Sequence, residues 1–259
     1  MELSFEVPTK SLKELGPLND FEFCLAHLAL TDEKYRNYFS KSKQFTVCDN
    51  SAFELGKPME HPDIIDAARV VKAQEIVSPD SFRNGTKTID ATENFISYLH
   101  QTNKKKEFKV MGVIQGNNAP DWANCLKYMN DHPEVDTIGV CYVSCHIFDQ
   151  DATNARLAAI RYLVNMGKVT KPIHLLGMGG NPIELKLHGN VPNLRSCDTS
   201  LPIVQGLSLD KFDPTAGLAG KKLARPHDFF NVNVAKEQLD CIIHNVNLMK
   251  EWATALSNV

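Results

Sequence analysis

Residues 109–143 read KVMGVIQGNNAPDWANCLKYMNDHPEVDTIGVCYV and contain the pattern that decides the fold. Two short apolar segments, 109–115 and 137–143, flank the amphipathic segment 121–131. A strand, a helix and a second strand in this order form the repeating unit of a parallel sheet, because the helix carries the chain back to the start of a neighbouring strand. These residues therefore predict a parallel α/β fold.

The same alternation extends along nearly the whole chain. Further strands are predicted at 21–30, 45–48, 75–78, 172–178, 194–198 and 203–207. Further helices are predicted at 32–40, 62–73, 88–101, 151–165 and 235–255. Eight strands that alternate with helices predict an α/β fold of the (β/α)8 TIM-barrel type, built as a single domain over residues 1–259.

The composition places the chain among globular proteins with one large core. It has 259 residues, of which 43% are hydrophobic and 23% charged. Glu2 and Glu6 stand where a secretory signal would need a basic flank, and no run reaches the roughly 18 apolar residues of a membrane span. The seven cysteines have irregular spacings, which are typical of a reducing compartment. We expect a soluble, cytoplasmic protein that makes no contact with a membrane.

The formal net charge of −3 gives the chain no overall attraction to nucleic acid. Any polyanion must therefore meet a local basic patch. One candidate is the lysine run 104–106, for which a solvated loop is the favoured interpretation. The other candidate is the stretch that holds Lys221, Lys222 and Arg225.

Polar side chains follow several of the predicted strands. In a parallel barrel the reactive residues collect at the C-terminal ends of the strands. Asp49, Asp80, Gln115 and Asp198 all occupy such positions. Two carboxylates facing each other allow one to attack an anomeric carbon while the other transfers protons. A third carboxylate beside an amide can bind the edge of guanine, which offers two N–H donors next to a carbonyl acceptor.

Each of these residues also has an alternative interpretation. Asp49 or Asp198 alone could cap the following helix, and Gln115 could be a surface amide. The glycine-rich stretch 177–180 could be a flexible connector or a loop that binds phosphate. The joint occurrence of polar residues at consecutive strand ends favours an active site over separate helix caps.

The order of these segments resembles the catalytic core of the tRNA-guanine transglycosylases, which are TIM-barrel enzymes that exchange guanine for a 7-deazaguanine base. The resemblance covers roughly residues 40–255. The family's D-S-G-G-F motif corresponds to Asp49-Asn50-Ser51-Ala52-Phe53, and its G-I-V-Q-G motif to residues 112–116. Its Y-L-M-G-V-G motif corresponds to residues 174–179, and its nucleophile to Asp198.

The resemblance implies a role for each matching residue. Asp198 would be the glycosyl nucleophile and Asp49 its acid/base partner. No cofactor is implied. The residues that would bind the base are Asp80, Gln115, Asn50, Ser51, Gly139, Val140, Leu176 and Gly177.

The chain departs from the family at the zinc site. Relatives that act on tRNA bind zinc through a C-x-C-x-x-C motif and the histidine of an I-H-N segment. Here His244 remains, but residues 218–230 contain no cysteine. A tetrahedral zinc site needs four ligands, which His244 and Cys241 cannot supply. We therefore predict no metal and no zinc-binding subdomain, and we expect His244 to be a packed or hydrogen-bonded helix residue.

The short length and the missing zinc region resemble the branch of the superfamily encoded by bacteriophages and bacterial modification islands. Members of that branch insert 7-deazaguanine bases into DNA, which protects it from restriction. The stretch 208–233 occupies the place of the zinc region and is predicted to be an insertion that contacts nucleic acid. Its candidate contact residues are Lys221, Lys222, Arg225 and His227, while Phe229 and Phe230 could stack on a base or anchor the loop.

The predicted function is therefore replacement of guanine in DNA by a 7-deazaguanine through a covalent sugar intermediate on Asp198. The target would be single-stranded DNA or a flipped guanine. Whether an accessory protein is needed to expose the target guanine is left open. The family's G-G-L-A motif corresponds to Gly139-Val140-Cys141-Tyr142 in this chain. Val140 and Tyr142 would crowd the pocket for the base. This favours a compact substituent on the base, such as the nitrile of 7-cyano-7-deazaguanine.

Two alternatives remain. The same chemistry could act on tRNA, although the missing zinc ligands argue against it. The chain could instead be a metabolic TIM-barrel enzyme whose 177–180 loop binds phosphate, which would call for a Schiff-base lysine or a metal cluster at a strand end.

Overall fold

The computed structural model describes residues 1–167, 169–188 and 191–255. The strands are β1 (Glu2–Phe5), β2 (Glu22–Leu25), β3 (Thr46–Asp49), β4 (Glu75–Val77), β5 (Lys109–Ile114), β6 (Thr137–Cys141), β7 (Ile173–Leu176) and β8 (Leu194–Thr199). The α-helices are α1 (Leu12–Leu15), α2 (Ala26–Thr31), α3 (Glu33–Phe39), α4 (Ala52–Leu55), α5 (His61–Val70), α6 (Gly85–Gln101), α7 (Ala119–Asp131), α8 (Ala152–Asn165), α9 (Glu184–Leu187), α10 (Leu201–Leu207) and α11 (Lys236–Ala255). Short 3-10 helices are η1 (Thr9–Ser11), η2 (Gly16–Leu18), η3 (Lys105–Glu107), η4 (Tyr142–Ile147) and η5 (Phe229–Asn231).

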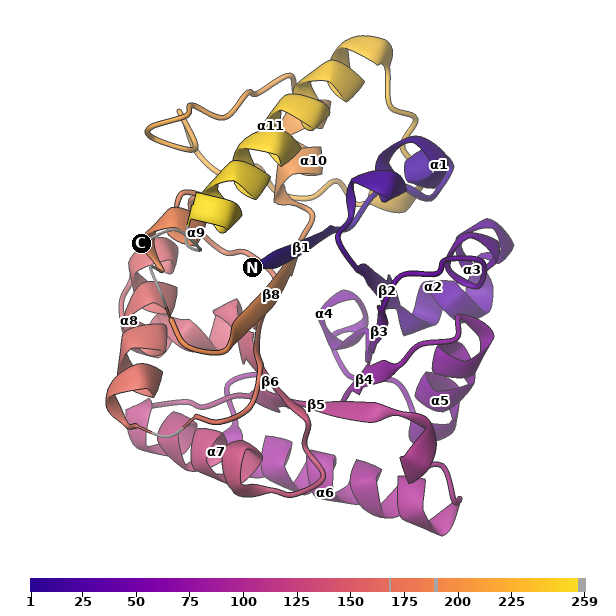
Figure 1. Ribbon diagram of the computed structural model, residues 1–259, viewed down its shortest axis with the longest axis vertical. Coiled ribbons are helices and arrows are strands. Elements are labelled where there is room, and N and C mark those ends of the chain that lie inside the picture. The colour runs from indigo at the N-terminus through magenta and orange to yellow at the C-terminus, as the bar shows by residue number, and fades with distance from the viewer. Residues whose placement is uncertain (168, 189–190, 256–259) are drawn as a thin grey trace.

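The eight strands form one parallel sheet that curls into a nearly closed barrel (Figure 1). The order around the barrel is β1-β8-β7-β6-β5-β4-β3-β2. Within the described residues, no ladder of hydrogen bonds joins β1 to β2, so the barrel has one open seam. Helices interleave with the strands and surround them. The predicted (β/α)8 TIM barrel is confirmed.

The barrel uses a different eighth strand from the one that the sequence predicts. Residues 203–207, predicted as a strand, lie in α10, and the missing strand is β1 at the N-terminus. Pro202 lies in the first turn of α10, where its missing N–H leaves no hydrogen bond unmade. The apolar run is buried because α10 packs against α11, and a short apolar run suits a buried helix as well as a strand.

The long helices agree with the prediction. The expected helices 32–40, 62–73, 88–101, 121–131, 151–165 and 235–255 appear as α3, α5, α6, α7, α8 and α11. Asn118 begins α7 by accepting a 2.9 Å hydrogen bond from the Asp121 N–H, and Asp151 begins α8 in the same way with Asn154. The predicted strand 21–30 is shorter than expected, because β2 ends at Leu25 and α2 follows directly.

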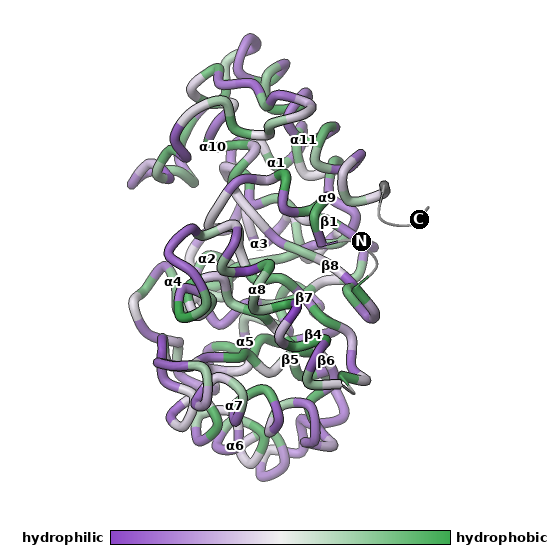
Figure 2. Tube along the Cα trace, turned by 90° about the vertical axis from the view of Figure 1, so that its left-hand side faces the viewer, coloured by the Kyte–Doolittle hydropathy of each residue, from purple (hydrophilic) through white to green (hydrophobic). Residues whose placement is uncertain are grey.

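The hydrophobic core has two layers. A small layer fills the barrel and consists of Phe21, Phe23, Val47, Val77, Met111, Val113 and Cys141. A larger layer lies between the sheet and the helices, where Phe95 of α6 and Trp122 of α7 are fully buried. In Figure 2 hydrophilic colours gather in the outer loops. In the described part of the chain, no helix combines the length and apolarity needed to cross a bilayer.

The placement of β1 can be tested by truncating Leu3, which is fully buried in the larger layer. We expect Leu3→Ala to lower the free energy of unfolding by about 2–5 kcal/mol, because it removes buried methyl groups and leaves a cavity. Leu187→Ala is the matched control, since Leu187 is 52% exposed, and it should change stability by no more than about 0.5 kcal/mol. Urea unfolding of both variants measures the difference. Equal, small effects would show that β1 is not part of the barrel.

Candidate active site

A cavity of about 520 Å³ lies at the C-terminal ends of the strands. This volume is within the roughly 300–1,000 Å³ range of small-molecule sites. Its lining is rich in carboxyl groups, which come from β3, β8, α4 and the loops after β1 and β4. The carboxyl-bearing residues are Glu6, Asp49, Glu54, Asp80 and Asp198. Three basic residues, Lys222, Arg225 and His227, line the same cavity.

Asp198 lies near the end of β8, and only one of its two carboxylate oxygens has polar contacts within the described residues. Its Oδ1 accepts a 3.0 Å hydrogen bond from the backbone N–H of Gly177 and lies 3.0 Å from Nε2 of His174. Within the described residues, no hydrogen bond reaches Oδ2. Because Asp198 lines the cavity, Oδ2 is the oxygen available for nucleophilic attack.

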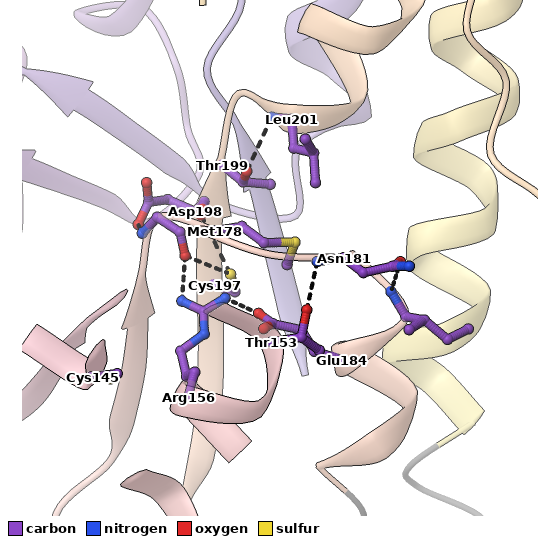
Figure 3. A network of polar contacts seen from close by, with 12 residues as sticks. Cys145, Thr153, Arg156, Met178, Asn181, Glu184, Cys197, Asp198, Thr199 and Leu201 are labelled. Atoms are coloured by element: carbon purple, nitrogen blue, oxygen red, sulfur yellow. Dashed lines mark hydrogen bonds and ion pairs between the residues drawn. The ribbon is translucent and has the colours of Figure 1, made fainter. Parts of the chain in front are cut away.

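A buried ion pair between Arg156 and Glu184, whose side chains Figure 3 shows, supports the loop that contains Gly177. Arg156 of α8 donates hydrogen bonds to the carbonyl of Gly177 and to the carboxylate of Glu184, and both charged side chains are fully buried. Gly177 has a left-handed φ of +64°, and a Cβ there would lie 2.9 Å from the ring of Tyr142. Glycine is therefore the residue that fits this position without strain.

Asp49, at the end of β3, is set up to hold a proton. Its Oδ2 accepts a 2.7 Å hydrogen bond from the Ser51 N–H. Burial raises the pKa of this carboxyl well above its usual range, and the negative charges of Glu54, Asp198 and Asp80 raise it further. Asp49 therefore favours its protonated form in the same cavity that Asp198 lines, and such a carboxyl group can donate a proton.

Asp80 is the centre of a hydrogen-bonded trio. Its two oxygens accept hydrogen bonds from Gln115 Nε2 at 2.7 Å and Asn50 Nδ2 at 3.0 Å. Gln115 Oε1 accepts from the Arg83 N–H, and Asn50 Oδ1 accepts from the Ala52 N–H. Burial raises the pKa of Asp80. Asp80 and Asn50 line the cavity, whereas Gln115 lies behind Asp80 and orients it.

The other predicted base-binding residues divide into two groups. Leu176 and Gly177 line the cavity. Ser51, Gly139 and Val140 do not line it. Ser51 is fully buried and its Oγ accepts a hydrogen bond from the His27 N–H, while Val140 packs in the core layer that faces the helices.

The placement of Val140 changes the expected shape of the pocket. The sequence predicts that Val140 and Tyr142 crowd the base together. Val140 is fully buried on the other side of the sheet, so only Tyr142 lines the cavity. The ring of Tyr142 packs against the loop of Gly177, which narrows the cavity at that point.

Residues 222–227 of the predicted nucleic-acid-binding insertion, 208–233, line the cavity, but two cations of this segment already have partners. Lys222 Nζ donates a 2.5 Å hydrogen bond to the carbonyl of Met178. Arg225 forms ion pairs with Glu6 at 2.5 Å and Glu54 at 2.8 Å. His227 is exposed and lines the cavity, and Lys221 is exposed outside it.

The phenylalanines of the insertion anchor it. Phe229 is 1% exposed and belongs to the larger core layer, and Phe230 packs against Tyr35. The guanidinium of Arg225 lies 5.6 Å and 5.3 Å from these two rings. Of the two interpretations that the sequence leaves open, base stacking and anchoring, their burial favours anchoring.

Three residues of the site are not among the sequence predictions: Glu6, Glu54 and His174. Burial, together with the negative charge of Glu54, raises the pKa of Glu6 to about 8 even though Arg225 opposes the shift. Glu6 directly follows β1, so recognising that strand would have placed it at a strand end. His174 interrupts an apolar strand, which is a visible signal. Glu54 gives no such signal.

The residues near His244 do not fit the zinc site of the resembling family. His244 Nε2 lies 3.1 Å from the carbonyl of Phe212, which makes it a hydrogen-bonded helix residue, and Cys241 is buried in the same helix. In residues 1–167, 169–188 and 191–255, no group of three or more His, Cys, Asp or Glu side chains is arranged to hold a metal ion.

Comparison with family models and with curated proteins found no match for this chain. The arrangement of groups in the cavity must therefore carry the functional inference.

The raised pKa of Asp49 makes stability depend on pH. Above the usual carboxyl pKa of 3.8, the unfolded chain loses this proton while the folded chain keeps it, so wild-type stability falls as the pH rises toward the folded pKa. Asp49→Asn removes that loss and can still accept the hydrogen bond from Ser51. We expect the variant to gain stability over wild type as the pH rises from about 4 to 7.

Urea unfolding at several pH values measures this difference. The matched control is Asp66→Asn, which changes an exposed aspartate on α5. A stability difference between Asp49→Asn and wild type that stays constant with pH would contradict the proton-holding role of Asp49.

Proposed function

We propose that the protein is a base-exchange transglycosylase that replaces guanine in DNA with a 7-deazaguanine. The observation that carries this proposal is the pairing of two unlike carboxyl groups in one cavity. Oδ1 of Asp198 accepts a hydrogen bond from the Gly177 N–H and lies 3.0 Å from His174 Nε2 while Oδ2 is free, whereas burial and neighbouring charges favour the protonated form of Asp49. A glycosyl exchange needs both a carboxylate that attacks C1′ and an acid that protonates the leaving base.

In the first half-reaction, Oδ2 of Asp198 attacks C1′ of the target nucleotide. The bond between C1′ and N9 breaks, its electron pair remains on guanine, and N9 takes the proton of Asp49. Guanine leaves, and the sugar stays attached to Asp198 as an ester. The carboxylate of Asp80, oriented by Asn50 and Gln115, supports this step because it can accept the N1–H and N2–H of guanine.

In the second half-reaction, a 7-deazaguanine occupies the position that guanine has left. Asp49 removes its N9 proton, N9 attacks C1′, and the ester bond to Asp198 breaks. Two displacements at C1′ retain the configuration of the sugar. Each proton that Asp49 gives in the first half returns in the second, so the exchange consumes no external acid or base.

The basic insertion supports a polymeric substrate over a free nucleoside. His227 and Lys221 remain exposed at or near the mouth, where a phosphodiester backbone would pass. Exchange at a guanine in a duplex would require the nucleotide to be flipped into the cavity. DNA is favoured over tRNA because the chain lacks the zinc region found in relatives that act on tRNA.

One observation favours a different class of enzyme. Among the described residues, Lys222 is the lysine that lines the cavity, and burial together with the charge of Arg156 lowers its pKa. A less protonated lysine amine can form an imine with a carbonyl substrate, with loss of water. This alternative predicts a secondary amine on Lys222 after borohydride reduction with substrate, and no such product in Lys222→Met.

The proposed exchange can be tested by nucleoside mass spectrometry. Purified protein is incubated with 7-cyano-7-deazaguanine and either DNA or tRNA, and the polymer is then digested. We expect a modified deoxynucleoside with wild type and none with Asp198→Ala, because the variant lacks the attacking oxygen. Asp66→Asn, on the exposed face of α5, is the matched control and should give wild-type product.

Detection of the modified nucleoside in DNA or in tRNA shows which of the two polymers is the substrate. Modification of tRNA alone would replace DNA by tRNA in the proposal. Product formation by Asp198→Ala would overturn the role of Asp198 with either polymer.

A further inference from the structure

A chain of polar side chains runs through the barrel from its lower end to Asp198. Arg195, at the start of β8, forms a 2.8 Å ion pair with the buried carboxylate of Glu75. Its Nε donates a 3.1 Å hydrogen bond to Ser196 Oγ. Ser196 Oγ lies 2.8 Å from Nδ1 of His174, and His174 Nε2 lies 3.0 Å from Asp198 Oδ1. The chain therefore links an ion pair at one end of the barrel to the nucleophile at the other.

The direction of each hydrogen bond in this chain follows from its first member. The Nε of an arginine can only donate, so Ser196 Oγ accepts from Arg195. The single hydrogen of Ser196 is then free to donate to Nδ1 of His174. With Nδ1 acting as an acceptor, the imidazole carries its hydrogen on Nε2 and donates it to Asp198 Oδ1.

The other forms of His174 fit the contacts less well. A hydrogen on Nδ1 would point at Ser196 Oγ, which already accepts from Arg195, and the hydroxyl hydrogen would then have no acceptor among the described residues. A bare Nε2 would also place two acceptors 3.0 Å apart at Asp198. The Nε2–H tautomer is the form in which every member of the chain has a partner.

Aromatic packing fixes the plane of the imidazole. His174 is fully buried, and its ring stacks on Phe23 at 5.4 Å with an interplanar angle of 8°. The edge of Phe21 meets the same ring at 5.9 Å. The ring cannot turn its nitrogens away from Ser196 and Asp198 without losing these contacts.

We propose that Arg195 and Ser196 lock His174 in the Nε2–H tautomer, and that His174 is a positioning residue that holds Asp198 Oδ1 so that Oδ2 faces C1′. The kinetic consequence of this inference rests on the proposed function. The tautomer itself is a property of the protein without substrate. The Gly177 N–H provides the second donor to Oδ1, so loss of His174 loosens the nucleophile without removing it.

The tautomer can be read directly by two-dimensional ¹H–¹⁵N NMR of protein labelled on histidine nitrogens, with His174→Gln used to assign the signal. We expect protonated Nε2 and unprotonated Nδ1 in wild type. Ser196→Ala removes the hydrogen donated to Nδ1, so the Nδ1 signal should move toward that of an imidazole nitrogen that accepts no hydrogen bond. A wild-type Nδ1–H form, or no change in Ser196→Ala, would overturn the lock.

The kinetic consequence can be measured by exchange of radiolabelled guanine into a guanine-containing DNA oligonucleotide, which does not depend on the identity of the 7-deazaguanine. His174→Phe keeps a ring but loses the donor, and we expect kcat to fall roughly 10- to 100-fold, as when other orienting hydrogen bonds are removed. The KM for guanine should change little, because His174 does not line the cavity. His174→Gln restores an N–H donor and should recover most of the rate.

A matched control separates this role from a general packing defect. His61→Gln changes a half-buried histidine on α5 that packs against Phe95 and Tyr98, and it should leave the rate unchanged. Equal rates for His174→Phe and wild type would overturn the positioning role while leaving base exchange intact. If wild type exchanges no guanine into DNA or tRNA, the proposed function is overturned. The NMR measurement would still show by itself whether Arg195 and Ser196 hold His174 in the Nε2–H tautomer.

Discussion

The carboxylate of Asp198 accepts hydrogen bonds on a single oxygen, and the polar interior of the barrel is organised around those two contacts. One comes from the Gly177 N–H, which the buried pair of Arg156 and Glu184 aims from the helix side. The other comes from His174 inside the barrel. Burial of Arg156 and Glu184 is costly, because Arg156 Nε and Glu184 Oε2 have no hydrogen-bond partner among the described residues, so the pair positions the Gly177 loop at a cost in stability.

Charge balance in the cavity explains how one site can hold both an acid and a nucleophile. Five carboxyl groups line it, and the guanidinium of Arg225 forms ion pairs with two of them, Glu6 and Glu54. Because the cations do not neutralise all of the carboxylates, at least one proton must be shared among the remainder. Burial raises the pKa of Asp49, which belongs to this remainder, and burial also raises the pKa of Glu6 although Arg225 opposes that shift.

Several elements could be predicted because their signals are local. Helices such as α6 and α8 carry a capping side chain and a periodic apolar face, and α11 was predicted within one residue. The strand β1 was missed because four residues carry too little pattern, and its identity depends on pairing with β8. The run 203–207 was misassigned because burial on all sides looks the same in a strand and in a helix.

The sequence by itself determined the α/β class, seven of the eight strands and the carboxylates at the strand ends, because these follow from periodicity and from the order of elements along the chain. Only the tertiary structure decided which groups touch. It placed Gln115 behind Asp80, tied Arg225 to two glutamates, and brought His174 against Asp198. Such contacts join residues far apart in sequence, and their distances depend on barrel closure, which no local pattern encodes.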